Sequence, residues 1–343
     1  MRQVPLGSTG LMVSEAGFGG IPLIRLDFEQ SAAVLKRAFE RGINFFDTAN
    51  MYMDSEEKIG KALSGERSRI VLASKTTLRE GEKALEHLAL TLSRLKTDYL
   101  DLYQLHNVSQ ESDVEAIAAP GGVLEAMRRA KEKGMIRHLG VSSHHPGIAL
   151  RLVQSGWFET IQFPFNFVEN EPVTGLLPAA REAGMGFIAM KPFAGGMLPD
   201  AGVAFKFLRR YPEAIPIPGF DSVEKVDEVV AIYEKPNVVA AEDEIEMERQ
   251  RAELGKQFCR RCQYCHPCPH GVRIMYAQMY RVAAIRMSPE RAVKFSADAM
   301  ESVRLCEQCG ECETKCPYGL PIMTMLEENL ALYDSHRAQC SGE

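Results

Sequence analysis

The chain has 343 residues, of which 45% are hydrophobic and 25% charged, and its formal net charge is −6 at pH 7. This length is ample for one large domain and a smaller one, and the composition is that of an ordinary globular protein. The acidic balance argues against a nucleic-acid partner, no apolar stretch reaches the ~20 residues of a membrane span, and the first residues lack a signal-peptide core. We therefore expect a cytoplasmic protein with no nucleic-acid partner and no membrane span.

Short apolar runs and helical patterns alternate along the first 235 residues. Ser8-Thr9-Gly10 predicts the turn of a β-hairpin. The expected strands that follow are 15–19, 43–46, 70–74, 99–105, 137–141, 160–163, 186–190 and 215–217. The expected helices are 29–41, 55–63, 82–95, 123–133, 146–154, 173–183, 202–210 and 222–232.

Eight strand–helix pairs in succession favour a closed (β/α)8 TIM barrel over an open doubly wound sheet, because each strand is covered by its own following helix. An open sheet that binds a dinucleotide would also need a glycine-rich fingerprint that opens a helix after the first strand. Here Gly17-Phe18-Gly19-Gly20 runs into Pro22 instead. The first 235 residues therefore predict an α/β barrel with an N-terminal hairpin.

Polar side chains stand where the expected strands end. The strand over 43–46 stops at Asp47, and Tyr52 follows five residues later. Later strand ends carry Lys75, His106, Ser142, Gln162 and Lys191. A lone Lys or His at such a place is more often solvated or structural, and Asp47 could equally cap a helix. Because the carboxyl ends of all barrel strands face one side, however, the whole set is expected to meet at one rim.

The first four of these side chains can together deliver a proton. A tyrosine hydroxyl has an ordinary pKa of about 10, which a nearby lysine cation lowers by favouring the phenolate. An aspartate would keep that lysine charged and in place, and a histidine could orient a carbonyl oxygen and stabilise the negative charge that develops on it. This is a proton donor for an alkoxide, and it needs a hydride source, because the barrel half shows neither a nucleophilic Ser or Cys nor a metal cluster.

The segments FFDTANMY, LASKT and DLYQLH, which contain Asp47, Tyr52, Lys75 and His106, resemble the catalytic tetrad of the aldo-keto reductase family. The resemblance covers roughly residues 1–235 and includes LGSTGLMVS, GVSS and IPIPGFDSVEK. It implies a TIM barrel that binds NADPH or NADH without a Rossmann domain and reduces a small-molecule carbonyl substrate. It further implies Tyr52 as general acid, Lys75 and Asp47 as the groups that tune it, and His106 as the group that positions the carbonyl.

The same resemblance implies contacts with the cofactor. Ser142 and Gln162 would meet the nicotinamide carboxamide, and the cofactor contacts carried over in addition are Ser143, Lys191, Gly219, Ser222 and Lys225. Many family members have Ser-Asn where this chain has Ser142-Ser143. Near the last strand, Lys225 is the one cation and Asp221 would repel a 2′-phosphate, so the sequence leaves the choice between NADPH and NADH open.

A cysteine-rich segment follows an expected linking helix over 236–257. None of the nine cysteines lies in residues 1–258, and eight of them fall in 259–268 and 306–316. The second run matches the ferredoxin spacing of three cysteines two apart and a fourth followed by proline. The first run is one residue short in its final gap and keeps the proline. Disulfides are unexpected in the cytoplasm, so residues 258–343 predict a ferredoxin-like domain.

In ferredoxin runs, the fourth cysteine serves the neighbouring cluster. We therefore expect two [4Fe–4S] clusters, one held by Cys259, Cys262, Cys265 and Cys316, the other by Cys306, Cys309, Cys312 and Cys268. Zinc is the alternative, because paired CxxC units also bind it, and the short gap could leave one site incomplete. Cys340 is expected to be a free thiol. Helical patterns over 272–286 and 289–302 resemble the all-helical dicluster modules of reductase subunits.

Two functions from different classes fit these features. The first is an NAD(P)H-dependent carbonyl reductase whose clusters are either structural or an electron route to a partner protein. The second is an electron-transfer or redox-sensing protein that uses the barrel as a docking scaffold. A scaffold would not require four intact tetrad positions, which favours the first. Nicotinamide gives up two electrons together, whereas each cluster accepts one, so we expect that NADPH or NADH does not directly bleach the clusters.

Overall fold

The structure is a computed structural model that describes residues 1–341. The chain divides into two compact units, which are described separately. The first contains residues 1–194 and 198–243, and the second contains residues 195–197 and the chain from Glu244 onward. No helix in the described part of the chain is both long and apolar enough to cross a membrane.

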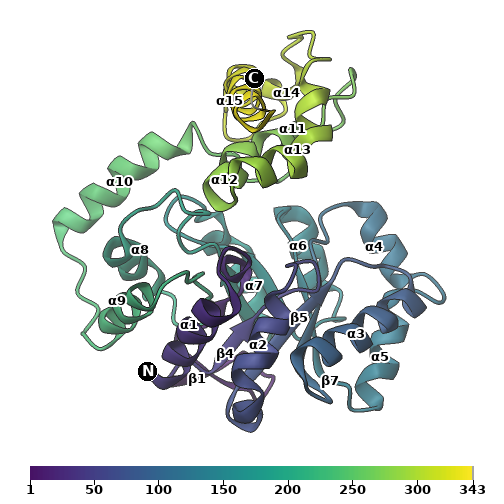
Figure 1. The fold of residues 1–343 in the computed structure, drawn as a ribbon, viewed down its shortest axis with the longest axis vertical. Coiled ribbons are helices and arrows are strands. Elements are labelled where there is room, and N and C mark those ends of the chain that lie inside the picture. Colours follow the sequence, from purple (N-terminus) through teal and green to yellow (C-terminus); the bar gives the residue numbers. More distant parts are fainter. Residues whose placement is uncertain (342–343) are drawn as a thin grey trace. The chain divides into compact units, whose positions relative to one another are not determined.

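The first unit is a (β/α)8 barrel, as predicted (Figure 1). Eight parallel strands pair in chain order: β3 (Phe18–Gly19), β4 (Phe45–Asp47), β5 (Val71–Thr76), β6 (Leu100–Leu105), β7 (Ile136–Ser142), β8 (Thr160–Pro164), β9 (Gly186–Met190) and β10 (Ala214–Pro216). Backbone hydrogen bonds from Gly17 to Pro216 (2.8 Å) and from Gly19 to Pro218 (2.7 Å) join the first strand to the last. A Cβ atom at Gly19 would lie 2.7 Å from the Ile217 carbonyl oxygen, so this closure requires glycine.

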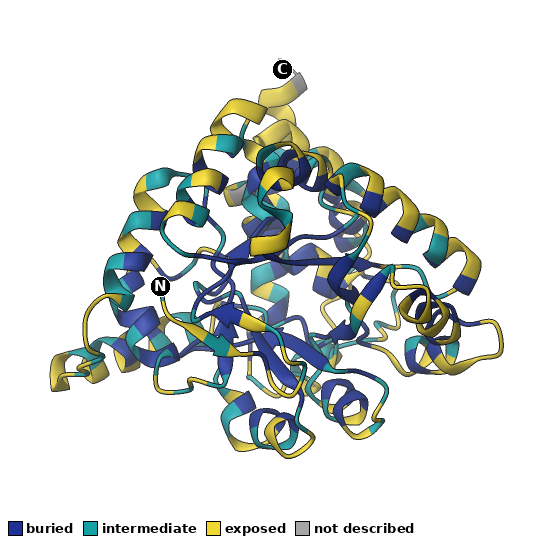
Figure 2. Ribbon diagram, turned by 90° about the horizontal axis from the view of Figure 1, so that it is seen from below, coloured by how far each residue is buried: buried dark blue, intermediate teal, exposed yellow. Residues whose placement is uncertain are grey.

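The eight expected helices surround these strands, and Figure 2 shows their exposed outer faces around buried strands. They are α1 (Phe28–Glu40), α2 (Ser55–Leu63), α3 (Gly81–Leu95), α5 (Val123–Glu132), α6 (Pro146–Gln154), α7 (Leu176–Glu182), α8 (Ala201–Leu208) and α9 (Val223–Tyr233). Capping residues mark the start of these helices. At the start of α1, Asp27 accepts a hydrogen bond from the Gln30 backbone N–H at 2.8 Å, and the Gln30 side chain accepts one from the Asp27 N–H. The sequence did not predict α4 (Glu111–Ala118) or the short 3₁₀ segments η1 (Ile21–Arg25), η2 (Ser64–Arg69) and η3 (Glu171–Thr174).

The expected N-terminal hairpin consists of β1 (Gln3–Pro5) and β2 (Met12–Ser14). Leu6 and Val13 are fully buried and belong to the same apolar cluster as Phe45 and Val71, the first residues of β4 and β5. The hairpin therefore covers the amino ends of the strands. The opposite rim, where the strands end, is left for chemistry.

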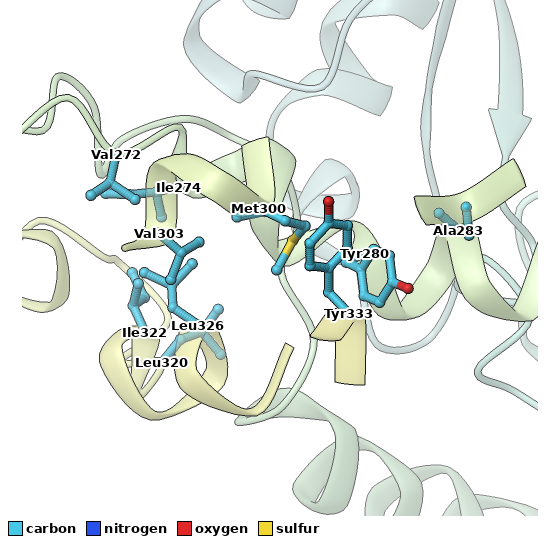
Figure 3. Close-up of a cluster of buried hydrophobic side chains, with 12 residues drawn as sticks. Val272, Ile274, Tyr280, Ala283, Met300, Val303, Leu320, Ile322, Leu326 and Tyr333 are labelled. Carbon is cyan, nitrogen blue, oxygen red and sulfur yellow. The ribbon is translucent and has the colours of Figure 1, made fainter. Parts of the chain in front are cut away.

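The second unit is helical. Its elements are α10 (Ala241–Gly255), which begins in the first unit, α11 (Ile274–Gln278), α12 (Tyr280–Arg286), α13 (Pro289–Val303), α14 (Glu311–Thr314) and α15 (Ile322–Ser341). The helix expected over 272–286 is divided at Met279, and the long α15 was not predicted. Figure 3 shows the core that α11, α12, α13 and α15 share, in which the rings of Tyr280 and Tyr333 meet edge to face, with 5.4 Å between their centroids. The two cysteine runs lie in the loops that this core supports.

Candidate functional site

A buried ion pair forms the base of the barrel rim. Asp47 ends β4 and Lys75 lies in the neighbouring β5, and the Lys75 ammonium donates a hydrogen bond to the Asp47 carboxylate. Lys75 also donates to the Thr48 carbonyl at 2.7 Å, and the Gln104 amide donates to the other Asp47 oxygen at 2.9 Å. Burial raises the pKa of Asp47 and lowers the pKa of Lys75, while the attraction between the two charges opposes both shifts.

Tyr52 and His106 complete the group. The turn after β4 carries Tyr52, whose backbone N–H donates to the Ala49 carbonyl at 2.9 Å and whose side chain is partly exposed. Its ring meets the His106 ring edge to face with 5.7 Å between centroids, and the Lys75 Nζ atom lies 5.6 Å from the Tyr52 ring centre. The structure thus brings together all four side chains that the sequence predicts to be catalytic.

The surroundings of His106 favour a neutral imidazole. Burial lowers its pKa well below the ordinary value, and the positive charges of Lys75, Arg79 and Lys191 lower it further. The Arg79 guanidinium donates to the His106 carbonyl at 2.8 Å, which fixes the backbone at this position. The Nδ1 atom is buried without a hydrogen-bond partner among the described residues. A neutral ring can donate one N–H to a substrate oxygen without carrying a charge of its own.

Two candidate nicotinamide contacts lie side by side on neighbouring strands. Ser142 in β7 pairs in register with Gln162 in β8. The Gln162 Oε1 atom is buried and has no hydrogen-bond partner within residues 1–341, so a donor such as an amide N–H could bind there. The Ser142 hydroxyl accepts from the Asn107 backbone N–H at 2.9 Å. The Ser143 hydroxyl accepts from the His145 N–H at 3.2 Å, so it supports the start of α6.

Lys191 belongs to a hydrogen-bonded chain that the sequence reasoning missed. Its Nζ atom contacts His144 Nε2, and His144 Nδ1 contacts Asn107 Oδ1 at 3.0 Å. Both Lys191 (φ 60°) and Asn107 (φ 53°) adopt the left-handed backbone conformation, which is uncommon outside glycine. Gln104 was also missed, although strand alternation places it on the same face as His106 and could have indicated it.

In the region after β10, the carboxylate of Asp221 is paired with cationic side chains of the same chain. Ser222 caps α9 by accepting from the Lys225 backbone N–H at 3.4 Å. The Lys225 ammonium donates to Asp221 at 2.6 Å, and the Arg25 guanidinium donates to the other Asp221 oxygen at 3.3 Å. A Cβ atom at Gly219 would lie 2.5 Å from a Pro22 ring carbon, so only glycine fits there. Asp221 therefore lies between the cations that could otherwise bind a phosphate.

Eight cysteines line two cavities in the second unit. One is lined by Cys259, Cys262, Cys265 and Cys316, and the other by Cys265, Cys268, Cys306, Cys309 and Cys312. Cys268 reaches the cavity of the second run despite the short gap before it, and Cys316 reaches the cavity of the first. Within residues 1–341, no group of three or more His, Cys, Asp or Glu side chains converges as it would around a single metal ion.

The cysteine loops share an unusual backbone. Arg261 and Gln263 flank Cys262 with φ of 64° each, and Gln308 (φ 54°) and Gly310 (φ 78°) flank Cys309 in the same way. Left-handed residues in such loops turn successive N–H groups inward, which is typical of anion-binding concavities and Fe–S sites. Burial raises the pKa of the Cys259 and Cys265 thiols to about 11 and about 12. Metal coordination would keep such thiols deprotonated.

A closed parallel barrel with this rim, joined to an eight-cysteine helical module, defines a barrel oxidoreductase with an appended iron–sulfur domain. Residues 16–204 match the sequence model of the aldo/keto reductase family, and residues 258–321 match that of a 4Fe-4S dicluster domain. The chain belongs to the aldo/keto reductase family and carries this dicluster domain at its C-terminus.

Individual relatives agree with this assignment. The "Uncharacterized oxidoreductase YqkF" of Bacillus subtilis is 33% identical over an alignment of 214 positions, and the match covers 58% of this chain and 67% of that protein. L-galactose dehydrogenase of Arabidopsis thaliana is 31% identical over an alignment of 216 positions, and the match covers 57% of this chain and 67% of that protein. Among solved structures, the holo form of aldo-keto reductase AKR11C1 from Bacillus halodurans is similar with a TM-score of 0.64 and 25% identity. The match covers 73% of this chain and 96% of that one.

Proposed function

We propose that the protein is an NAD(P)H-dependent reductase of small-molecule carbonyls, with Tyr52 as proton donor. The buried Lys75–Asp47 pair beside the Tyr52 and His106 rings is the observation that carries this proposal. A buried charge pair is costly to maintain, and here it adjoins a partly exposed phenol. Perturbed titratable groups of this kind are typical of catalytic sites.

The roles of the four side chains follow from their chemistry. The nicotinamide cofactor supplies a hydride when bound. The His106 N–H binds the substrate carbonyl oxygen and polarises it, and Tyr52 donates its proton to that oxygen as negative charge develops there. The Lys75 cation favours the phenolate that remains, and Asp47 keeps Lys75 charged in a buried place. General acid catalysis of this kind contributes about 10²–10⁴-fold to a rate.

The cofactor contacts are proposed on the same basis. Gln162 Oε1 is a buried acceptor that would pair with the carboxamide of nicotinamide, beside Ser142. Ser143 and Lys191 would stand near the same ring. The adenosine end of the cofactor would lie along Gly219, Ser222 and Lys225. There Asp221 neutralises Lys225 and Arg25, the cations that could bind a 2′-phosphate. We therefore propose NADH as the preferred cofactor.

In the second unit we propose two [4Fe–4S] clusters with crossed ligand sets. Cys259, Cys262, Cys265 and Cys316 would hold one cluster, and Cys306, Cys309, Cys312 and Cys268 the other. Two cysteine-lined cavities, which have Cys265 in common, support this division. We also propose the domain bounds 1–235, 236–257 and 258–343, a cytoplasmic location, and clusters that are either structural or pass electrons to a partner protein.

The Tyr52→Phe variant tests the catalytic proposal. It should lose about 10²–10⁴-fold of single-turnover carbonyl reduction and retain its nicotinamide affinity, because only the hydroxyl is removed. Tyr99→Phe is the matched control: Tyr99 stacks on Arg67 at 3.9 Å, outside the rim, and should keep full activity. Full turnover in Tyr52→Phe would show that the acid lies elsewhere. The docking-scaffold alternative predicts that neither form binds nicotinamide at all.

A further inference from the structure

The second unit contains a cavity of about 360 Å³ that the functions proposed above do not use. Small-molecule sites typically occupy about 300–1,000 Å³ and have apolar walls with a few convergent polar groups. The apolar walls of this cavity are formed by Phe258, Met279, Val282, Pro321 and Met325. Aromatic and methionine side chains are suitable neighbours for the faces and edges of an aromatic ring.

Gln278 supplies a buried acceptor to this cavity. Its side chain is only 5% exposed, and its amide nitrogen donates to the Ile322 carbonyl at 3.2 Å. Its Oε1 atom has no hydrogen-bond partner among the residues that the structure describes. Because an unpaired buried acceptor is costly, a ligand that presents an N–H at this point is favoured.

The charged groups at the cavity favour a phosphate. Arg281 lines the cavity but pairs at 3.1 Å with Glu328, which lines it as well. Lys256 also lines it, is exposed, and forms no ion pair with any described residue. Lys256 is therefore the cation that remains for an anionic group of a ligand.

The cavity adjoins a candidate cluster site. Cys259 and Gln278 line both this cavity and the cavity formed by the first three cysteines and Cys316. A ligand here would be separated from a cluster by single side chains. That position is useful for a molecule that exchanges electrons.

We propose that this cavity binds a flavin mononucleotide, with its ring system between the apolar walls, its ring N–H on Gln278 Oε1 and its phosphate at Lys256. This inference rests on the proposed clusters. Flavins accept two electrons and can release them singly, which nicotinamides cannot do. A reduced flavin, FlH₂, would give one electron to each of two oxidised clusters and release two protons, which leaves oxidised flavin and two singly reduced clusters.

Binding is tested by the quenching of flavin fluorescence during titration of the intact, cluster-loaded chain. We expect saturation at one flavin mononucleotide per chain. Met279→Trp should fill the cavity and abolish binding, whereas Tyr276→Trp, in the adjoining α11 but outside the cavity lining, should bind normally. Absence of quenching, or normal binding by Met279→Trp, would overturn the site.

Two further variants test the individual contacts. Gln278→Leu should weaken binding roughly tenfold through loss of the acceptor. Lys256→Glu should weaken flavin mononucleotide roughly tenfold and leave riboflavin unchanged, because only the former carries a phosphate. Equal effects on both flavins would contradict the phosphate position.

The redox step has its own test. Photoreduced flavin mononucleotide should reduce the clusters of the wild-type chain rapidly, at two clusters per flavin, and those of Met279→Trp at least tenfold more slowly. Equal rates in the two would contradict the electron route. Iron and sulfide assays on the same samples report failure of the cluster proposal separately from failure of the flavin site.

Discussion

The barrel rim and the cysteine loops both gather reactive side chains, but they do so by opposite means. At the rim, Asp47, Tyr52, Lys75 and His106 come from three successive strand ends. Strand register holds them together, with hydrogen bonds to Asp47 and ring contacts of Tyr52. In the second unit the cysteines are neighbours in sequence, and they lie in loops with left-handed residues and only one short helix.

This difference concerns what organises each site. The charged groups at the rim are already paired, because Lys75 and Asp47 form a hydrogen-bonded ion pair. Burial raises the pKa of the Cys259 and Cys265 thiols, and as thiolates the cysteines of these loops would repel one another without a metal. We therefore expect the barrel to preorganise its chemistry, and the clusters to organise the loops that hold them.

The largest expected effect concerns the crossed ligand sets. Cys268→Ser and Cys306→Ser should each lose one cluster, and the Cys268→Ser/Cys306→Ser double variant should lose no more than either. Cys268→Ser/Cys259→Ser should lose both clusters. Iron content and EPR of the reduced proteins measure this. If ligands are not crossed between the runs, the two double variants exchange their results.

The next effect concerns the preorganised rim. Lys75→Met leaves the Asp47 carboxylate buried without a cation, which should lower the free energy of unfolding by about 3–5 kcal/mol. Asp47→Asn/Lys75→Met should recover much of this loss, because no unpaired charge remains. Urea unfolding followed by Trp157, the one tryptophan of the chain, reports on the barrel. Equal destabilisation in the single and double variants would show that the lost charge pairing is not the cause.

A smaller effect concerns cofactor choice. Asp221→Ser frees Lys225 and Arg25 for a 2′-phosphate, so the affinity for NADPH relative to NADH should rise by about tenfold. Fluorescence titration with both nucleotides measures the ratio, and Asp200→Ser, which alters the cap of α8 instead, is the control. An unchanged ratio in Asp221→Ser would place the adenosine end of the cofactor elsewhere.

The smallest effect is the pH dependence of stability from His106. Its folded pKa lies below the unfolded value of about 6.5, so the unfolded chain binds more protons in acid, and stability falls as the pH decreases below 6.5. The contribution is about 1 kcal/mol between pH 6.5 and 5.5. Subtracting the profile of His106→Asn from that of the wild type isolates it, and identical slopes would show that the imidazole is not held neutral.

Much of the barrel could be predicted from sequence, because its signals are local. Apolar runs mark each strand, caps such as Asp27 mark the helices, and parallel strands bring their ends to one rim. The pairing of the Asp221 carboxylate with Arg25 could not be predicted, because Arg25 lies 196 positions away in the sequence. The missed α4 lies in the loop after β6, where no strand or helix alternation gave a reason to expect an element.

The cysteine module shows the same limit. Cysteine spacing indicates metal ligands in any fold, so the two cysteine runs could be recognised from the sequence alone. The long α15 was not predicted, although Ile322, Leu326 and Tyr333 recur at helical spacing and contribute to the core. Cavities beside the cysteine loops arise from packing between helices distant in sequence, which no local pattern reveals.

An anaerobic titration of the intact chain with NADH and a test aldehyde examines the central claim most directly. The account predicts that one nicotinamide binds, that alcohol forms in proportion to the NADH consumed, and that cluster absorbance stays unchanged while no flavin is added. Failure to bind nicotinamide, or rapid bleaching of the clusters by NADH alone, would contradict it.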